Sequence, residues 1–252
     1  MLEFRNITAG YGHSVILNDI SAIFPDRQIS VLAGPNGSGK TTLLQTLTGA
    51  CSVMKGGIFL NGEDLLKLPA RERAKKLSFL PQIRTVIPAL PVRTFVEHGR
   101  FPYLGFYRRK TAEDESLIRQ AMEFTNTLPF ADLPMNTLSG GIRQRVFLAM
   151  ILAQNCDYII LDEPTTYLDL EGQREFFAMI RALRAQNKTV IMVLHDLSQA
   201  MRIADHLVVM EERKICFLGT PKESLKKHVP EEVFHVDWKR FSDTDGEYYF
   251  FE

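Results

Sequence analysis

Apolar and polar residues alternate over residues 2–8, a pattern typical of a half-buried antiparallel strand. Apolar-rich segments over 15–24 and 28–32 predict two further strands. Gly10 and Gly12 predict a turn between the first two of these strands. The N-terminal part of the chain is therefore expected to form an antiparallel β portion.

Short runs that are mostly apolar predict further strands, most of them buried. The first of these runs, 29–33, is the strand already expected at 28–32, and the others occupy residues 58–60, 77–80, 158–161 and 189–194. A turn is expected at 55–57 before the second run, and a hairpin over 206–211 and 214–219. Segments with helical spacing lie between the strands, over 41–47, 69–76, 92–98, 113–128, 140–153, 170–186 and 197–203. This order predicts an α/β fold with a mixed sheet as its core.

The pattern changes after Gln82, where prolines and helical segments replace the strands. We interpret residues 83–157 as a helical subdomain inserted into an α/β core made of 1–82 and 158–220. Residues 221–252 form a C-terminal extension in which the sequence indicates no chemistry. The chain is expected to be a single domain of this composite kind.

A glycine-rich segment joins an expected strand to an expected helix and matches the phosphate-binding pattern G-x-x-x-x-G-K-[ST]. Its residues are Gly34, Pro35, Asn36, Gly37, Ser38, Gly39, Lys40, Thr41 and Thr42. Glycines let backbone N–H groups turn toward an anion, and the helix N-terminus adds its dipole. Lys40 can bind the β- and γ-phosphates, and the Thr41 hydroxyl can bind Mg²⁺. A chance match in an ordinary turn is the alternative, and the flanking strand and helix argue against it.

Two adjacent carboxylates, Asp162 and Glu163, follow the buried strand at 158–161. Ligands bind at the carboxyl ends of strands in open α/β sheets. Since adjacent side chains on a strand point oppositely, we expect Asp162 to face Mg²⁺ and Glu163 to face the attacking water. Two exposed acids at a strand end are the alternative. His195 ends the next buried strand, where a structural role is the simpler interpretation.

Ser139, Gly140 and Gly141 begin the helix at 140–153, and Ser139 is a suitable N-cap. Bare backbone N–H groups at a helix start form a second candidate anion site, although an ordinary capped helix fits equally well. Tyr11 is an aromatic residue next to a turn, where it could stack on adenine or pack against the protein.

The composition excludes several classes of protein. Thirty basic and thirty acidic residues cancel, so no strong field attracts nucleic acid. No apolar run is long enough to span a bilayer, and the N-terminus lacks the apolar core of a signal peptide. Cys51, Cys156 and Cys216 lie far apart, and no His or Cys spacing indicates a disulfide framework or a transition-metal site.

The order of these motifs resembles the ATPase subunits of ATP-binding-cassette (ABC) transporters over nearly the whole chain. The resemblance implies an enzyme that binds ATP and Mg²⁺, hydrolyses ATP and works as a head-to-tail homodimer. Tyr11 resembles the aromatic residue that stacks on adenine, and residues 34–42 the phosphate loop. Gln82 resembles the glutamine that senses Mg²⁺ and the attacking water. Ser139, Gly140 and Gly141 match the signature that caps the γ-phosphate of ATP held by the other subunit.

Four further residues take roles from the same resemblance. Asp162 and Glu163 match the magnesium ligand and the general base, Asp169 the aspartate at the dimer seam, and His195 the switch histidine at the γ-phosphate. The chain departs from the family at Ile142, where a polar residue is usual. We therefore expect the dimer to close but do not assume ordinary kinetics.

Residues 163–170 and 99–103 resemble the importers of ferric siderophores, haem and cobalamin. That branch implies a separate transmembrane permease, a substrate-binding protein and a peripheral position at the cytoplasmic face of the inner membrane, with no nucleic-acid partner. Residues 83–107 would form the docking face, although an aromatic-rich lobe with its own small core is equally compatible with them. The exposed residues expected on the docking face are Phe101, Tyr103, Phe106, Tyr107, Arg108 and Arg109.

Three other functions remain as alternatives. An exporter ATPase would carry the same catalytic motifs. A soluble ABC ATPase acting on ribosomes or DNA would be expected to have two cassettes, a coiled coil or a basic extension. A small-molecule kinase would have no need of the Leu138-Ser139-Gly140-Gly141 element.

Overall fold

The structure is a computed structural model that describes residues 1–82, 87–104, 110–166, 168–243 and 246–252. The strands are β1 (Leu2–Tyr11), β2 (Ser14–Phe24), β3 (Ile29–Ala33), β4 (Ser52–Leu60), β5 (Glu63–Asp64), β6 (Leu77–Leu80), β7 (Tyr158–Asp162), β8 (Thr189–Val193), β9 (His206–Glu211), β10 (Lys214–Gly219), β11 (Trp238–Asp243) and β12 (Gly246–Phe251). The α-helices are α1 (Lys40–Thr48), α2 (Ala70–Arg73), α3 (Val92–Glu97), α4 (Ala112–Phe124), α5 (Gly140–Ala153), α6 (Leu170–Ala185), α7 (Leu197–Ile203), α8 (Pro221–Lys226) and α9 (Val229–Phe234).

The central sheet has six strands in the order β10-β9-β3-β8-β7-β6. All neighbours are parallel except the β9–β10 hairpin. The carboxyl ends of β3, β6, β7 and β8 therefore lie at one edge, where ligands bind in sheets of this kind. The phosphate loop follows β3, Gln82 follows β6, and the carboxylates end β7.

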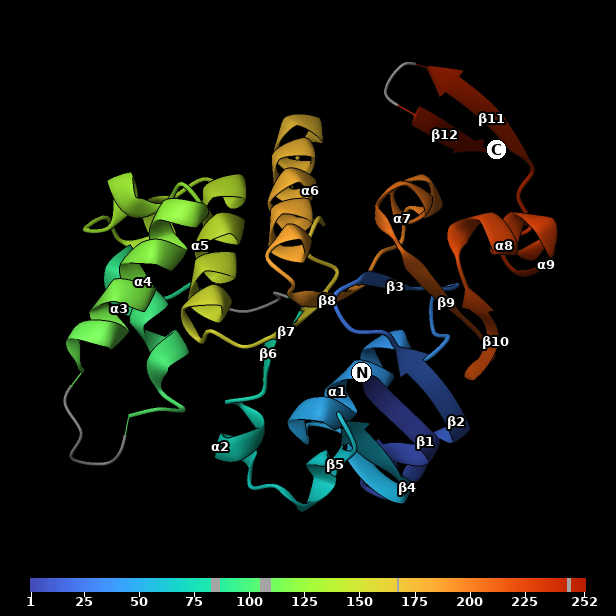
Figure 1. Ribbon diagram of the computed structural model, residues 1–252, viewed down its shortest axis with the longest axis horizontal. Coiled ribbons are helices and arrows are strands. Elements are labelled where there is room, and N and C mark those ends of the chain that lie inside the picture. The colour runs from blue at the N-terminus through green and yellow to red at the C-terminus, as the bar shows by residue number, and fades with distance from the viewer. Residues whose placement is uncertain (83–86, 105–109, 167, 244–245) are drawn as a thin grey trace.

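This sheet is buried on both faces, which explains why its strands are almost continuously apolar. On β3, Ile29 and Val31 belong to one core, whereas Leu32 belongs to the other. One core lies under α6 and α7. The other lies between the sheet, α1 and the antiparallel sheet β2-β1-β4-β5. The α/β fold with a mixed sheet is confirmed, and Figure 1 shows the antiparallel sheet, coloured from blue to teal, beside α1.

The turn expected at 55–57 is wrong, because β4 runs through it from Ser52 to Leu60. Gly56 has φ +85°, and a Cβ there would lie 2.4 Å from the carbonyl oxygens of Arg5 and Asn6. Glycine is therefore needed for a bulge between β1 and β4, where their register shifts between Arg5 and Thr8. The first strand is also longer than expected, since β1 continues to Tyr11.

Helices α3, α4 and α5 pack around a third core, separate from the two cores of the sheet. They form the green and yellow-green lobe of Figure 1. The α4 helix is shorter than the expected 113–128, because it ends at Phe124 and a separate 3₁₀ turn follows at Leu128–Phe130.

A buried arginine ties two helices of the lobe to each other. Arg100 Nε donates to Asp114 Oδ1 at 2.9 Å, and both side chains are buried. Arg100 also donates to the carbonyl oxygens of Ala153 and Gln154 at the end of α5. This network holds the N-terminus of α4 against the C-terminus of α5.

The expected exposed face of this lobe is only partly present. Phe101 is 58% exposed, but Tyr103 is not exposed as expected. The Tyr103 ring lies under the Arg100 guanidinium, 4.0 Å from it, and its hydroxyl donates to Lys75 O. The other four aromatic and basic residues expected on this face lie outside the described residues.

The C-terminal extension is folded. After α8 and α9, the β11–β12 hairpin lies beside α7. Trp238 and Tyr249 pack edge to face at 5.9 Å, and Trp238 Nε1 donates to Glu231 Oε1 at 2.9 Å. The extension adds aromatic side chains to the core under α7.

Candidate functional site

The phosphate loop turns sharply between β3 and α1 because all three of its glycines, Gly34, Gly37 and Gly39, adopt positive φ. Gly34 has φ +146°, and a Cβ there would lie 2.0 Å from Met210 O. Gly39 has φ +98° at the N-cap of α1, where no side chain caps the helix. The N-terminus of α1 therefore presents its unpaired N–H groups and its dipole to the space in front of the loop.

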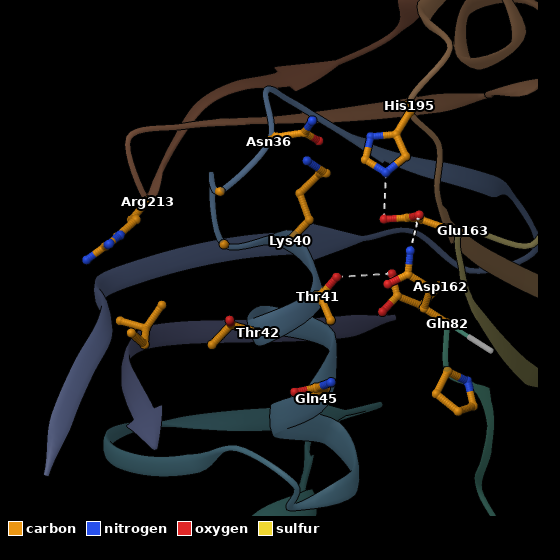
Figure 2. A pocket seen from close by; sticks show the side chains of 14 residues that line it. Asn36, Lys40, Thr41, Thr42, Gln45, Gln82, Asp162, Glu163, His195 and Arg213 are labelled. Atoms are coloured by element: carbon orange, nitrogen blue, oxygen red, sulfur yellow. Dashed lines mark hydrogen bonds and ion pairs between the residues drawn. The ribbon is translucent and has the colours of Figure 1, made fainter. Parts of the chain in front are cut away.

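A cavity of about 750 Å³ opens in front of this loop. It is lined by Ile16, Asn36, Gly37, Gly39, Lys40, Thr41, Thr42, Gln45, Pro81, Gln82, Asp162, Glu163, His195 and Arg213. Segments from β2, the phosphate loop, β6, β7, β8 and the β9–β10 turn meet here (Figure 2). A nucleoside triphosphate fits a polar cavity of this size.

Lys40 is buried and held by the loop itself. Its Nζ donates to Gly34 O and Pro35 O at 2.8 Å each, and to Ser38 Oγ at 3.4 Å. Burial lowers the Lys40 pKa, an effect opposed by the negative charges of Glu163 and Asp162. The ammonium group is thus positioned at the loop for a phosphate oxygen.

Asp162 fits the expected magnesium site. Thr41 Oγ1 donates to Asp162 Oδ1 at 3.3 Å, while the buried Oδ2 has no hydrogen-bond partner. Burial raises the Asp162 pKa to about 6, reinforced by the charge of Glu163 and opposed by the Thr41 bond. No group of three or more His, Cys, Asp or Glu that could hold a metal occurs among the described residues. The Thr41 hydroxyl and the unpartnered Asp162 Oδ2 are oxygen ligands of the kind that Mg²⁺ prefers.

Glu163 lies between two polar side chains. Gln82 Nε2 donates to Glu163 Oε2, and His195 Nε2 lies 2.5 Å from Glu163 Oε1 (Figure 2). Glu163 is the first residue after β7, and its φ of +52° is unusual for a residue other than glycine. The three residues come from the ends of β6, β7 and β8, which are adjacent in the sheet.

The signature residues line a different cavity, of about 530 Å³. Ser139 caps α5 by accepting from Ile142 N, and Asp169 caps α6 by accepting from Gly172 N at 2.8 Å. Gly140 and Gly141 line the cavity beside them. Within one copy of the chain, these residues are not brought to the phosphate loop.

Tyr11 does not line the first cavity. Its hydroxyl donates to Gln45 Oε1, and Gln45 does line it. The cavity is also lined by four residues that no sequence motif marks as site residues, namely Ile16, Gln45, Pro81 and Arg213. Arg213 was placed in the expected hairpin turn, but its position at the cavity depends on how that hairpin packs.

Residues 17–166 match the ABC transporter family. This chain belongs to that family. The match includes the phosphate loop, the signature residues and both carboxylates, so the resemblance predicted from the motifs is confirmed. The chain is accordingly an ABC ATPase, an enzyme that binds ATP.

Three relatives align with almost the whole of this ABC ATPase. The achromobactin transport ATP-binding protein CbrD of Dickeya dadantii is 39% identical, over 95% of this chain and 89% of the relative. The probable siderophore transport ATP-binding protein YusV of Bacillus subtilis is 38% identical, over 94% and 86%. The ferric enterobactin transport ATP-binding protein FepC of Escherichia coli is 36% identical, over 92% and 86%.

Solved structures agree with the fold. The inward-facing structure of an ABC transporter described as metal-chelate type has a TM-score of 0.85 at 24% identity, covering 100% of this ABC ATPase and 96% of that chain. A dimeric bacterial ABC transporter cassette has a TM-score of 0.75 at 25% identity, covering 88% and 99%. A cassette dimer bound to ADP and phosphate has a TM-score of 0.76 at 24% identity, covering 88% and 99%.

Proposed function

We propose that this ABC ATPase drives the import of an iron chelate, such as a ferric siderophore, through a separate transmembrane permease. The observation that carries the proposal is the similarity of nearly the full chain to ATP-binding proteins of siderophore transport. None of the helices in the described ranges is long and apolar enough to cross a bilayer. The chain would therefore act as a peripheral subunit on the cytoplasmic side of the membrane, supplied with substrate by a binding protein.

The phosphate loop would hold the triphosphate. Lys40 exchanges its bonds to Gly34 O and Pro35 O for phosphate oxygens, and the α1 N-terminus donates N–H groups to the same anion. Mg²⁺, when bound at Thr41 and Asp162, would offset the charge of the β- and γ-phosphates. The unpartnered Asp162 Oδ2 is available for this contact, directly or through water.

Glu163 would act as the general base that accepts a proton from the attacking water. Gln82 and His195 hold its two oxygens from opposite sides, which fixes the carboxylate beside the phosphate loop. When ATP occupies the cavity, His195 and Gln82 are placed to turn toward the γ-phosphate and the water. Glu163 then needs no large movement to reach the water, so the barrier is lowered by positioning.

A second copy would complete the site. Ser139, Gly140 and Gly141 line their own cavity, apart from the phosphate loop of the same chain. A head-to-tail pair places each signature helix start against the γ-phosphate held by the partner. Closure on ATP and reopening after hydrolysis would then supply the movement that the lobe passes to the permease.

The helical lobe would contact the permease through Phe101. Its ring is exposed, yet it stacks on His98 at 4.6 Å, and His98 lies 5.9 Å from Phe95 in the lobe core. Phe101→Ala should reduce iron-chelate uptake in cells while leaving ATP binding by the purified protein unchanged. Normal uptake by this variant would contradict the docking assignment.

The proposal is tested by purifying the tagged protein from gently solubilised membranes and identifying its partners by mass spectrometry. A stoichiometric polytopic permease is expected, and cells lacking the ATPase should fail to accumulate ferric siderophore. Recovery of ribosomal proteins without a permease would contradict the proposal. Export of a substrate by the recovered complex would contradict the import direction while leaving the ATPase activity intact.

A further inference from the structure

The turn between β9 and β10 is strained at its two residues. Glu211 pairs with Lys214, so only Glu212 and Arg213 form the turn. Their φ values are +44° and +63°, which is the left-handed geometry of a type I′ hairpin. Asn and Gly are the usual residues at such positions, because other side chains raise the energy there. Arg213 therefore adopts a left-handed backbone conformation that is unfavourable for arginine.

The Arg213 side chain lies at the nucleotide cavity without a protein partner. It lines the cavity together with the phosphate loop (Figure 2). Across the described ranges, its guanidinium takes part in no hydrogen bond, ion pair or ring contact. A strained residue with an unused charged group at a binding site indicates a ligand contact.

The position of Arg213 identifies which part of the ligand it meets. Glu163 and His195 mark the γ-phosphate end, and the start of α1 marks the middle of the triphosphate. Figure 2 shows Arg213 at the far end, beyond Thr42 from Glu163. A triphosphate held in this direction extends its nucleoside toward Arg213. The other residues that line this part of the cavity include Ile16 and Gln45.

We propose that Arg213 binds the base of ATP by laying its planar guanidinium on the face of the ring. This inference rests on the proposed nucleotide site and adds the residue that holds the base. Guanidinium groups stack on aromatic faces, and such a contact tolerates different bases because each has a π face. Ile16, from β2, provides an apolar surface in the same cavity.

The test compares four ligands by equilibrium binding to the purified full chain: MgATP, MgADP, MgGTP and magnesium tripolyphosphate. Arg213→Ala should weaken the binding of the three nucleotides by a similar factor, roughly threefold to tenfold, because one cation–π contact is lost. Tripolyphosphate has no base, so its affinity should not change. Arg213→Lys keeps the charge but not the plane, and should restore only part of the loss.

Arg27 supplies a matched control. It is also an exposed arginine at positive φ, +57°, but it is not among the residues that line the cavity. Arg27→Gly and Arg213→Gly should both leave the nucleotide-free protein at least as resistant to urea as the wild type, because glycine relieves the strain. Only Arg213→Gly should weaken nucleotide binding.

The proposal is overturned if Arg213→Ala binds nucleotides with wild-type affinity. It is also overturned if Arg213→Ala weakens tripolyphosphate binding by the same factor as nucleotide binding, or if Arg213→Lys has full wild-type affinity. Lys40→Ala separates this failure from failure of the site itself. If Lys40→Ala abolishes binding of every ligand while Arg213→Ala changes none, the nucleotide site stands and the base contact does not.

Discussion

Glu163 combines an unusual backbone with an unusual set of neighbours. Its positive φ directs the carboxylate to where Gln82 and His195 both reach it, and the residue directly before it is the buried Asp162. Strain at such a position persists only when the surrounding structure enforces it. Here the end of the buried β7 strand and the two polar contacts do so.

Glu163→Gln should bind MgATP with little change in affinity and lose roughly 10²–10⁴ of the hydrolysis rate, because the amide cannot accept the proton from water. Phosphate release and equilibrium ATP binding measure the two effects separately. Glu113→Gln is the matched control, since Glu113 is an exposed glutamate on the lobe. Near-normal turnover by Glu163→Gln would show that another group is the base.

The sequence predicted those cavity residues that a short stretch of sequence identifies by itself. The phosphate loop, Asp162 and Glu163 follow from short spacings and from the strands before them. His195 and Gln82 reach Glu163 because β6, β7 and β8 are neighbours in the sheet, which the motifs alone do not state. Arg213 was not predicted as a cavity residue, because its place there depends on the tertiary position of the hairpin turn.

Single elements depend on backbone features that a residue pattern describes poorly. The Gly56-Gly57 pair looks like a turn, yet it belongs to a bulged strand whose partner lies about fifty residues earlier. The aromatic residues of the extension are likewise ambiguous until α7 supplies the surface on which they pack. The sequence thus predicted the strands of the central sheet well, and the bulge and the extension poorly.

Gly56→Ala should destabilise the chain by about 2–4 kcal/mol, since a Cβ would clash with two backbone oxygens as well as adopt positive φ. Gly62→Ala is the control. Gly62 also has positive φ, +83°, but no heavy atom lies within 4 Å of its Cβ position. This variant should lose only about 1 kcal/mol. Equal losses in urea unfolding would contradict the bulge argument.

The Arg100–Asp114 pair should make lobe stability depend on pH. Burial raises the Asp114 pKa, but hydrogen bonds from Thr111 and Arg100 outweigh it and hold the pKa at about 2, below its usual 3.8. Because the pKa is lower in the folded state, the ionised Asp114 stabilises the fold at pH values above its unfolded-state pKa. This stabilisation is lost as the pH falls toward about 2.

Asp114→Asn should therefore lower the free energy of unfolding by about 2–4 kcal/mol at pH 7, and the difference from wild type should shrink between about pH 4 and pH 2. Urea unfolding across this range measures it. Asp132→Asn, an exposed change in the same lobe, is the control and should track the wild type. A difference that is constant with pH would exclude the ionised pair as its source.

The whole molecule carries two half-sites. The phosphate loop lines one cavity and the signature residues another, so a single copy holds the parts of a site without joining them. In the proposed dimer, association of two copies would use both cavities, and the exposed Ser139 at the start of α5 would meet the partner. The fold was predictable from sequence at this scale, and the resemblance implied that the signature residues serve the other subunit, but the lining of each cavity required the structure.

Light scattering coupled to size-exclusion chromatography, applied to Glu163→Gln with and without MgATP, is the decisive measurement of the shared site. A shared site predicts a mass of 28.7 kDa without nucleotide and twice that mass with it. Adding Gly141→Asp should abolish the dimer but not ATP binding by the monomer. An added Cβ at Gly141 meets only Leu168, at 3.7 Å, so the fold tolerates the change while the carboxylate repels the γ-phosphate. A Glu163→Gln protein that stays monomeric at saturating MgATP, or a double variant that dimerises equally well, would contradict the shared site.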